Sequence, residues 1–450
     1  MPLLSDSDSS YSGLRSGAFW GLCAFSVLNP AVTQAGMYFL PSGIAGYSPM
    51  QLFQGVYLVV ILATLPLICR DATSLSRQFK WLAILYTAGL CAIHVRIWAM
   101  GRTPSYLATA ERIVCLRIIM SCLLWYYVSL LVSSPKHALR LMNSLILGGS
   151  VCAVWILFFY FRQGGSVAAY AASGVEASFG SEGVSGKAVA GLLLSSAVGM
   201  MYMAIRNASG FRAVGVLLLL GALFVTFDRS AQVAVGCVAL WSVIWWQRSC
   251  RPRSAMRVLT VFLVGLVLCG SVYLIHRGTD ELIARWTFDF DRGEVGSGRG
   301  VFYTTAWRWF VWDSDLGDFV MGMGFANIHE LIFQHTGLAV HCHSDLFDMI
   351  VMGGVFGLVL YLLMWGVLAS TAMNVPVRSV EFGAMGAMLA AFGVMSLLTG
   401  QMNFPLTMYP LGAQLVCMRV LALSSDAACS YEETAGWAPS GAMDSLPAHW

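Results

Sequence analysis

The chain has 450 residues, of which 58% are hydrophobic and only 11% are charged, and its formal net charge is +3. Soluble domains carry about 25% charged residues, so this composition excludes a soluble protein and indicates an integral membrane protein. The small, scattered positive charge excludes a nucleic-acid-binding protein, and most of the twelve cysteines lie in apolar runs, which indicates no disulfide framework.

Apolar windows that are long enough to cross a bilayer as helices recur along the chain. The N-terminus lacks the basic start and the cleavage site of a removed signal, so we expect the first window to be a retained helix. The seventh and eighth windows flank a charged turn, and one long kinked segment is the alternative there. The sequence predicts an all-α polytopic membrane protein with twelve spans, at about residues 17–34, 52–69, 81–98, 112–132, 141–161, 187–205, 212–227, 231–247, 258–275, 345–370, 382–400 and 406–424.

The spans divide the chain into an N-terminal membrane part over residues 1–275, a large loop over 276–344 and a C-terminal membrane part over 345–424. The polar tail over 425–450 has the composition of a disordered segment. A shorter loop over 162–186 is rich in glycine, serine and alanine, which is typical of a flexible or re-entrant connection.

Basic residues in the short connections orient the chain, because such residues stay in the cytoplasm. The connections that carry most of them lie on one side, which places both termini in the cytoplasm: Arg70, Arg77, Lys80, Lys136, Arg140, Arg206, Arg212, Arg248, Arg251, Arg253 and Arg257. Twelve of the 26 basic residues nevertheless fall on or near the outer face, which favours an anionic ligand there: Arg96, Arg102, Arg112, Arg117, Arg162, Lys187, Arg229, Arg277, Arg285, Arg292, Arg299 and Arg308. Long translocated loops escape the rule, so Arg112, Arg117 and Arg229, near helix ends, carry more weight.

A charged turn, Asp228-Arg229-Ser230, separates the two middle spans on the outer side. The simpler interpretation of Arg229 is a side chain that extends from a helix end to the interface. The alternative is a cation that faces a ligand.

The large loop contains Gly298-Arg299-Gly300, an aromatic stretch and then Gly322-Met-Gly324. The residues after Arg299 predict an amphipathic helix on the membrane surface, with Trp307, Trp309 and Trp312 in the interfacial belt. Stacking of these rings on sugars is the alternative.

Four of the eight histidines, at positions 329, 335, 341 and 343, gather where the loop meets the tenth span. Titratable side chains at a membrane surface indicate binding or chemistry. The pair His341-Cys-His343 is a weak metal signal, because no further ligand pattern accompanies it. The acidic pair Asp289-Phe-Asp291 is more typical of a solvated loop.

These motifs, in this order, resemble the superfamily of O-antigen ligases and Wzy-type polymerases, which are bacterial envelope glycosyltransferases with many helices and one large periplasmic loop. The resemblance covers residues 212–371, and the first half of the chain matches only in hydropathy. The first match is Asp228-Arg229-Ser230, at the place of a Ser/Thr-Arg-Ser turn. The second is Ser297-Gly298-Arg299 at the place of Ser-Gly-Arg, followed by Trp307 in an aromatic helix and by Gly322 and Gly324 as the Gly-x-Gly. The third is His343-Ser344, a histidine that enters a helix with glycines at Gly354 and Gly357. Asp228 departs from the family pattern, which weakens the first match.

The resemblance implies transfer of a glycan from a polyprenyl-diphosphate donor to an acceptor hydroxyl, without a metal or cofactor. Diphosphate departure develops negative charge, and fixed cations can stabilise it. Arg229 and Arg299 can supply bidentate contacts to both phosphates, and His343 can orient the acceptor hydroxyl and take its proton. His341, Arg308 and Asp345 are possible auxiliary residues, and His329 and His335 are expected to lie apart from the site.

The same resemblance implies a multi-pass protein of the bacterial inner membrane with its site facing the periplasm. Its expected partners are an undecaprenyl-diphosphate-linked oligosaccharide, a glycan or lipid-core acceptor, membrane lipids, a chain-length regulator and a flippase, and no nucleic acid. Asp345 and Asp348 favour a polymerase of exopolysaccharide or O-antigen over a ligase to lipid A core or a protein O-oligosaccharyltransferase. A transporter is the alternative from a different functional class. Transporters usually carry charged residues within their spans, and such residues are scarce here.

Overall fold

The computed structural model describes residues 7–39, 49–69, 73–102, 108–162, 186–207, 209–226, 229–248, 299–337, 340–402 and 405–435. Within these ranges the regular elements are helices, and no strand is present. The helices are α1 (Ser7–Phe39), α2 (Pro49–Ile68), α3 (Ser74–Ala99), α4 (Ala108–Leu131), α5 (Pro135–Arg162), α8 (Gly186–Arg206), α9 (Gly210–Val225), α10 (Arg229–Arg248), α13 (Arg299–Arg308), the π-helix η1 (Trp309–Asp313), α14 (Leu316–Met321), α15 (Phe325–Thr336), α16 (Asp345–Met373), α17 (Val380–Thr399) and α18 (Pro405–Ala435).

The fold confirms the predicted all-α polytopic membrane protein. Among the described residues, eight helices are long and apolar enough to cross a membrane, namely α2, α3, α4, α5, α8, α16, α17 and α18. The predicted windows at 17–34, 212–227 and 231–247 coincide with α1, α9 and α10. The window at 258–275 and most of the loops at 162–186 and 276–344 lie outside the described residues.

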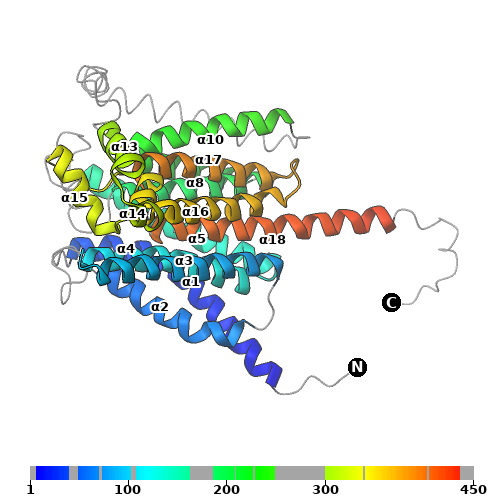
Figure 1. The fold of residues 1–450 in the computed structure, drawn as a ribbon. Helices are drawn as coiled ribbons and strands as arrows, with labels where there is room; N and C mark the ends of the chain where they lie inside the picture. Colours follow the sequence, from blue (N-terminus) through cyan, green and yellow to red (C-terminus); the bar gives the residue numbers. More distant parts are fainter. Residues whose placement is uncertain are drawn as a thin grey trace, which may run out of the picture.

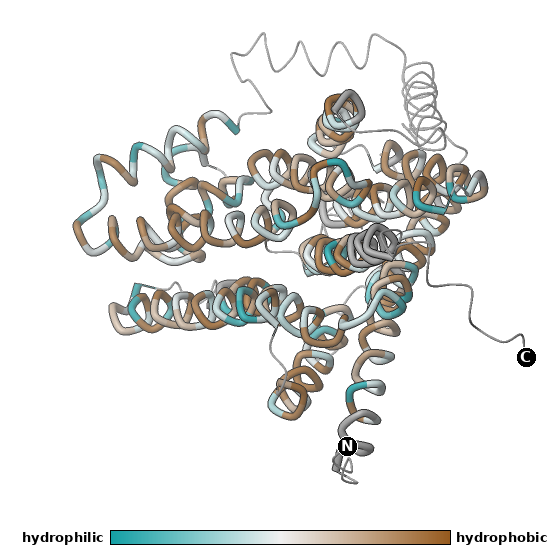
Figure 2. Tube along the Cα trace, turned by 90° about the vertical axis from the view of Figure 1, so that its right-hand side faces the viewer, coloured by the Kyte–Doolittle hydropathy of each residue, from teal (hydrophilic) through white to brown (hydrophobic). Residues whose placement is uncertain are grey.

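The long helices run side by side in one bundle, with α8 and α18 among its most buried members (Figure 1). Trp125 of α4 shows how closely α18 is packed: its indole nitrogen donates to the carbonyl of Met408, and a Cβ on Gly412 would lie 2.3 Å from its ring. Many large apolar side chains are exposed on the outside of the bundle, among them Val56, Leu62 and Trp98. Figure 2 shows that most of the helices are hydrophobic along much of their length. An apolar exterior is what contact with lipid requires.

The two helices on either side of the predicted charged turn have different neighbours. α9 packs against α5 and α8, whereas α10 packs along α17. Trp241 and Trp245 of α10 fit over Gly386 and Gly383 of α17, where an added Cβ would lie 2.2 Å and 2.5 Å from the indole atoms. The structure therefore has two separate helices here, rather than one kinked segment.

Candidate active site

The four short helices of the large loop, α13, η1, α14 and α15, gather at one end of the bundle, beside the beginning of α16 (Figure 1). α13 begins at Arg299 and includes the aromatic residues Phe302 and Tyr303. This confirms the helix that we predicted after Arg299. The histidine loop, residues 340–344, leads directly into α16.

α16 is interrupted ten residues after it begins. Gly354 has φ 60° and ψ −146°, which is not helical. The interruption breaks the usual pattern of backbone hydrogen bonds, and two carbonyls before it accept from the loop instead: Met323 N donates to Val351 O over 2.9 Å, and Gly324 N donates to Met352 O over 3.0 Å. The Gly-x-Gly segment after α14 therefore satisfies the backbone of a broken helix.

In both glycine motifs, the Gly-x-Gly segment and the glycines of α16, the backbone approaches other backbone atoms so closely that a larger residue does not fit. An added Cβ on Gly322 would lie 2.2 Å from the carbonyl oxygen of Met352, and one on Gly354 would lie 2.3 Å from that of Phe319. Gly357 has a similar restriction, since its Cβ would lie 2.1 Å from the carbonyl oxygen of Met349. Gly322 and Gly354 thus allow α14 and the residues after it to pack directly against the backbone of α16, whereas Gly357 relieves crowding within α16 itself.

Two arginines at the end of α3 hold α14 in place. Arg96 Nη2 donates to Asp318 Oδ1 over 2.7 Å, and Arg102 Nη1 donates to both oxygens of the same carboxylate over 2.8 Å. Arg96 also donates to the carbonyl of Gly322. Asp315 begins α14 by accepting from Asp318 N over 2.7 Å, and this hydrogen bond, together with Arg102, holds the pKa of Asp315 below its usual range.

For Arg96 and Arg102, this network differs from the expectation that the outer basic residues bind an anionic ligand. Arg96 and Arg102 lie at the expected end of the molecule, but the anions they bind are carboxylates of the same chain. Asp318 lies more than 200 residues further along the chain. The sequence pattern did not identify it as the partner of either arginine, which is why the expectation was different.

Asp345 anchors the beginning of α16 to the connection between α17 and α18. Its buried carboxylate accepts from Ser396 Oγ over 2.7 Å, Gln401 N over 2.8 Å and Met402 N over 2.9 Å. These donors occupy both carboxylate oxygens. Asp345 therefore positions the helix that follows the histidine loop.

Asp348, one helical turn further on, organises the histidine loop itself. Its Oδ2 lies 2.8 Å from His341 Nδ1, and its Oδ1 accepts from Cys342 N over 2.8 Å. His343 N also lies 3.1 Å from His341 Nδ1. One ring nitrogen cannot donate to the carboxylate and accept from this N–H at once, so we assign the proton to His341 Nδ1, which makes the shorter contact. His341 Nε2 is then left as an acceptor.

His343 has a backbone conformation that few residues adopt. Its φ is 59°, the single positive value among the described residues other than glycine. Such a conformation persists where the surrounding contacts maintain it, and it is frequent at functional sites. The rings of His343 and His341 are 4.2 Å apart, and Phe302 of α13 lies 6.2 Å from the His343 ring.

Arg299 and Tyr303 connect α13 to the same region. Arg299 donates from Nη1 to the carbonyl of Leu398, near the end of α17, where the helix dipole favours a cation. Tyr303 stacks on Phe347 of α16 with ring centroids 4.9 Å apart. Burial raises the pKa of Tyr303, and the positive charge of Arg299 opposes this rise.

The remaining predicted residues are placed as follows. The backbone of Arg229 begins α10, while its side chain and Asp228 lie outside the described structure. Arg308 is 72% exposed and lies 3.7 Å from Asp313. His335 contacts the carbonyl of Leu331 on its own helix, over 3.0 Å.

The structure also brings together residues that the sequence pattern did not single out. His329, which we expected to lie apart from the site, has its ring 6.3 Å from that of His341. Gly400 lies behind the cluster, since a Cβ there would be 3.6 Å from both Asp348 Oδ2 and His341 Cε1. Its position at the end of a predicted span was the available signal, but sequence alone does not place the end of α17 beside the histidine loop.

The cluster contains a histidine that can accept a proton and an arginine that can bind an anion nearby. A histidine oriented by a carboxylate can accept a proton, and an arginine on the neighbouring helix can bind an oxyanion through its planar fork. The Cys342 thiol is buried, which raises its pKa well above the usual value, so it is not a reactive thiolate. Among the described residues, no group of three or more histidine, cysteine or acidic side chains is arranged to hold a metal ion.

Comparison with known families agrees with the resemblance that the motifs carry. Residues 214–362 match the model of the O-antigen ligase family. The match begins in α9 and ends in α16, so it includes both glycine motifs, Arg299 and the histidine loop. No curated protein matches the chain significantly. The chain is therefore a polytopic membrane protein whose residues 214–362 match the O-antigen ligase family.

Proposed function

We propose that the protein transfers a glycan from a polyprenyl-diphosphate donor to an acceptor hydroxyl, and that it polymerises repeat units of an exopolysaccharide or O-antigen. The family match supports a membrane enzyme that transfers glycans in polysaccharide or O-antigen biosynthesis. The observation that carries the proposal is the histidine loop, in which Asp348 holds His341 beside His343, next to the helix that begins with Arg299.

In this proposal, the acceptor hydroxyl attacks the anomeric carbon of the donor glycan. A new carbon–oxygen bond forms, the bond from that carbon to the diphosphate oxygen breaks, and its electron pair leaves with the diphosphate. His343 takes the hydroxyl proton. Arg299 and Arg229 stabilise the charge on the departing diphosphate.

His341 and Asp348 have a positioning role in this proposal. The carboxylate holds both the His341 ring and the backbone of Cys342, and thereby the turn that presents His343. We further propose that the protein lies in the bacterial inner membrane, with both termini in the cytoplasm and this end of the bundle in the periplasm. A chain-length regulator and a flippase are its proposed partners.

Disruption of the gene, followed by chain-length analysis of the glycans, tests the function. A polymerase leaves single repeat units and no longer chains. Long chains that accumulate without attachment to lipid A core would instead identify a ligase, and loss of glycan on proteins alone would identify a protein O-oligosaccharyltransferase.

Complementation with His343→Ala tests the proposed base. We expect no long chains, with protein level and lipid-linked donor unchanged. His341→Ala serves as the comparison, since it removes a positioning residue and should retain partial transfer. If His343→Ala transfers glycan at the full rate and His341→Ala loses all glycan transfer, the proposed base is His341 and not His343.

A further inference from the structure

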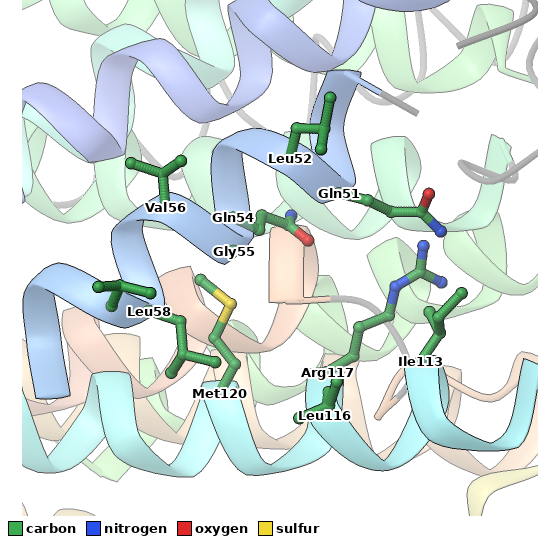
Figure 3. Close-up of a pocket in the computed structure, with 11 residues that line it drawn as sticks. Gln51, Leu52, Gln54, Gly55, Val56, Leu58, Ile113, Leu116, Arg117 and Met120 are labelled. Carbon is green, nitrogen blue, oxygen red and sulfur yellow. The ribbon is translucent and has the colours of Figure 1, made fainter. Parts of the chain in front are cut away.

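A cavity of about 450 Å³ lies between α2 and α4, at the edge of the bundle (Figure 3). Its walls are mainly apolar, with Val56 and Leu58 on α2 and Leu116 and Met120 on α4. This volume is within the range of about 300–1,000 Å³ that is typical of ligand sites. The described residues that line it come from α2 and α4.

One end of the cavity is polar, and its charge is positive. Arg117 extends toward Gln51 there, and Gln54 lies next to them (Figure 3). The Nε atom of Arg117 is buried and donates to no acceptor among the described residues. Among the described residues that line the cavity, none is acidic. A buried cation that lacks a carboxylate partner favours an anionic ligand, because burial of an unpaired charge is costly.

The polar end faces the same end of the molecule as the histidine loop. Arg96 ties the end of α3 to α14 there, so α4, which follows α3, begins at this end, and α2, which precedes α3, begins there as well. Arg117 lies five residues after Arg112, where the membrane span of α4 begins, which is about 7.5 Å along the helix. An arginine at this depth can reach the headgroup region.

We propose that this cavity binds an anionic phospholipid, with the phosphate on Arg117 and an acyl chain along the apolar walls. An acyl chain fits the apolar length of the cavity, and the phosphate supplies the missing partner of the guanidinium. The site is separate from the one proposed for glycan transfer, since Arg299 lies on α13, and His341 and His343 lie just before α16. It does not depend on that proposal.

The test uses the full-length protein in nanodiscs that contain equal amounts of phosphatidylglycerol and phosphatidylcholine, followed by native mass spectrometry. We expect one retained phosphatidylglycerol, and about tenfold weaker retention in Arg117→Gln, which removes a charged hydrogen-bond donor. Arg112→Gln is the matched control, because it removes the same charge from an exposed position on the same helix and should retain the lipid.

Two further variants separate binding from folding. Gly55→Leu fills the cavity from a position where an added Cβ meets no atom within 4 Å, so it should expel the lipid while Arg117 stays in place. Arg117→Lys keeps the charge and should restore part of the retention. Equal retention of both lipids by the unmodified protein, or unchanged phosphatidylglycerol retention in Arg117→Gln, would overturn the proposal, as would retention of a polyprenyl phosphate in preference to phosphatidylglycerol.

Discussion

His341 and His343 are separated by one residue, but different contacts determine their orientations. A carboxylate fixes the ring of His341, whereas a left-handed backbone conformation fixes the direction of His343. The two kinds of restraint suit different roles: an oriented ring positions its neighbours, and a strained turn presents a side chain to a substrate. Asp348 is thus the residue on which both depend.

Replacement of Asp348 by Asn tests this dependence. An amide has one acceptor oxygen, while His341 Nδ1 and Cys342 N require two. We expect kcat for glycan transfer to fall by about a hundredfold, as displaced catalytic groups commonly cause, while KM for the donor changes little. Steady-state kinetics on the purified protein measures both.

Asp345→Asn is the control for a purely structural effect. Its carboxylate accepts three hydrogen bonds that tie α16 to the α17–α18 connection, so this variant should lower the unfolding temperature. If Asp348→Asn lowers the unfolding temperature equally and leaves kcat unchanged in the folded fraction, its positioning role is wrong.

Arg299→Lys tests the proposed diphosphate contact. Lysine keeps the charge but loses the planar fork, so we expect transfer to slow by about tenfold to a hundredfold, the equivalent of one or two charged hydrogen bonds. The measurement is the initial rate with a lipid-diphosphate-linked donor. Arg378→Lys, at an exposed position between α16 and α17, should transfer normally, and normal transfer by Arg299→Lys would exclude the proposed contact.

At the scale of elements, the interruption of α16 determines the geometry of the site. The helix is broken at Gly354, and the Gly-x-Gly segment after α14 supplies the backbone donors that the break requires. In a membrane protein, non-helical backbone is tolerated where protein surrounds it and satisfies its polar groups. α14 and the segment after it therefore pack closely against α16, and Arg96 and Arg102 attach α14 to the end of α3.

Gly322→Ala tests the close contact between Gly322 and α16. Gly322 has φ 71° and ψ −179°, a region that is nearly restricted to glycine, and its Cβ would meet the carbonyl of Met352. We expect a loss of stability of about 1–3 kcal/mol from the backbone conformation alone, seen as a lower unfolding temperature in detergent. Gly337→Ala is the control: its φ is 72°, but a Cβ there meets nothing within 4 Å. Equal effects of the two variants would show that the contact with α16 contributes nothing.

At the scale of the whole molecule, the bundle has two chemically different ends. One end carries α13–α15 and the histidine loop (Figure 1). At the other end, Arg206 pairs with Glu381, and this pair joins the end of α8 to the beginning of α17. In the orientation that we propose from the positive-inside rule, the Arg206 end lies in the cytoplasm.

Labelling with a membrane-impermeant maleimide in intact cells tests this orientation. Trp312→Cys and Met373→Cys place thiols at positions that are 79% and 71% exposed, at opposite ends of the bundle. We expect Trp312→Cys to react in intact cells and Met373→Cys to react only after permeabilisation. The unmodified chain gives the background from native cysteines, and the reverse pattern would invert the proposed topology.

Hydropathy determined the membrane class and most span positions from sequence alone, because apolar character over about twenty residues is a local property. The order of Arg299, the Gly-x-Gly segment and the histidine loop likewise indicated the family, because the order and spacing of residue types belong to the linear chain. The tertiary structure decided what each of these residues touches. Asp318 binds Arg96 and Arg102, Asp348 holds His341, and Gly322 meets Met352. Contacts between elements depend on packing in space, and a linear pattern of residue types does not contain that information.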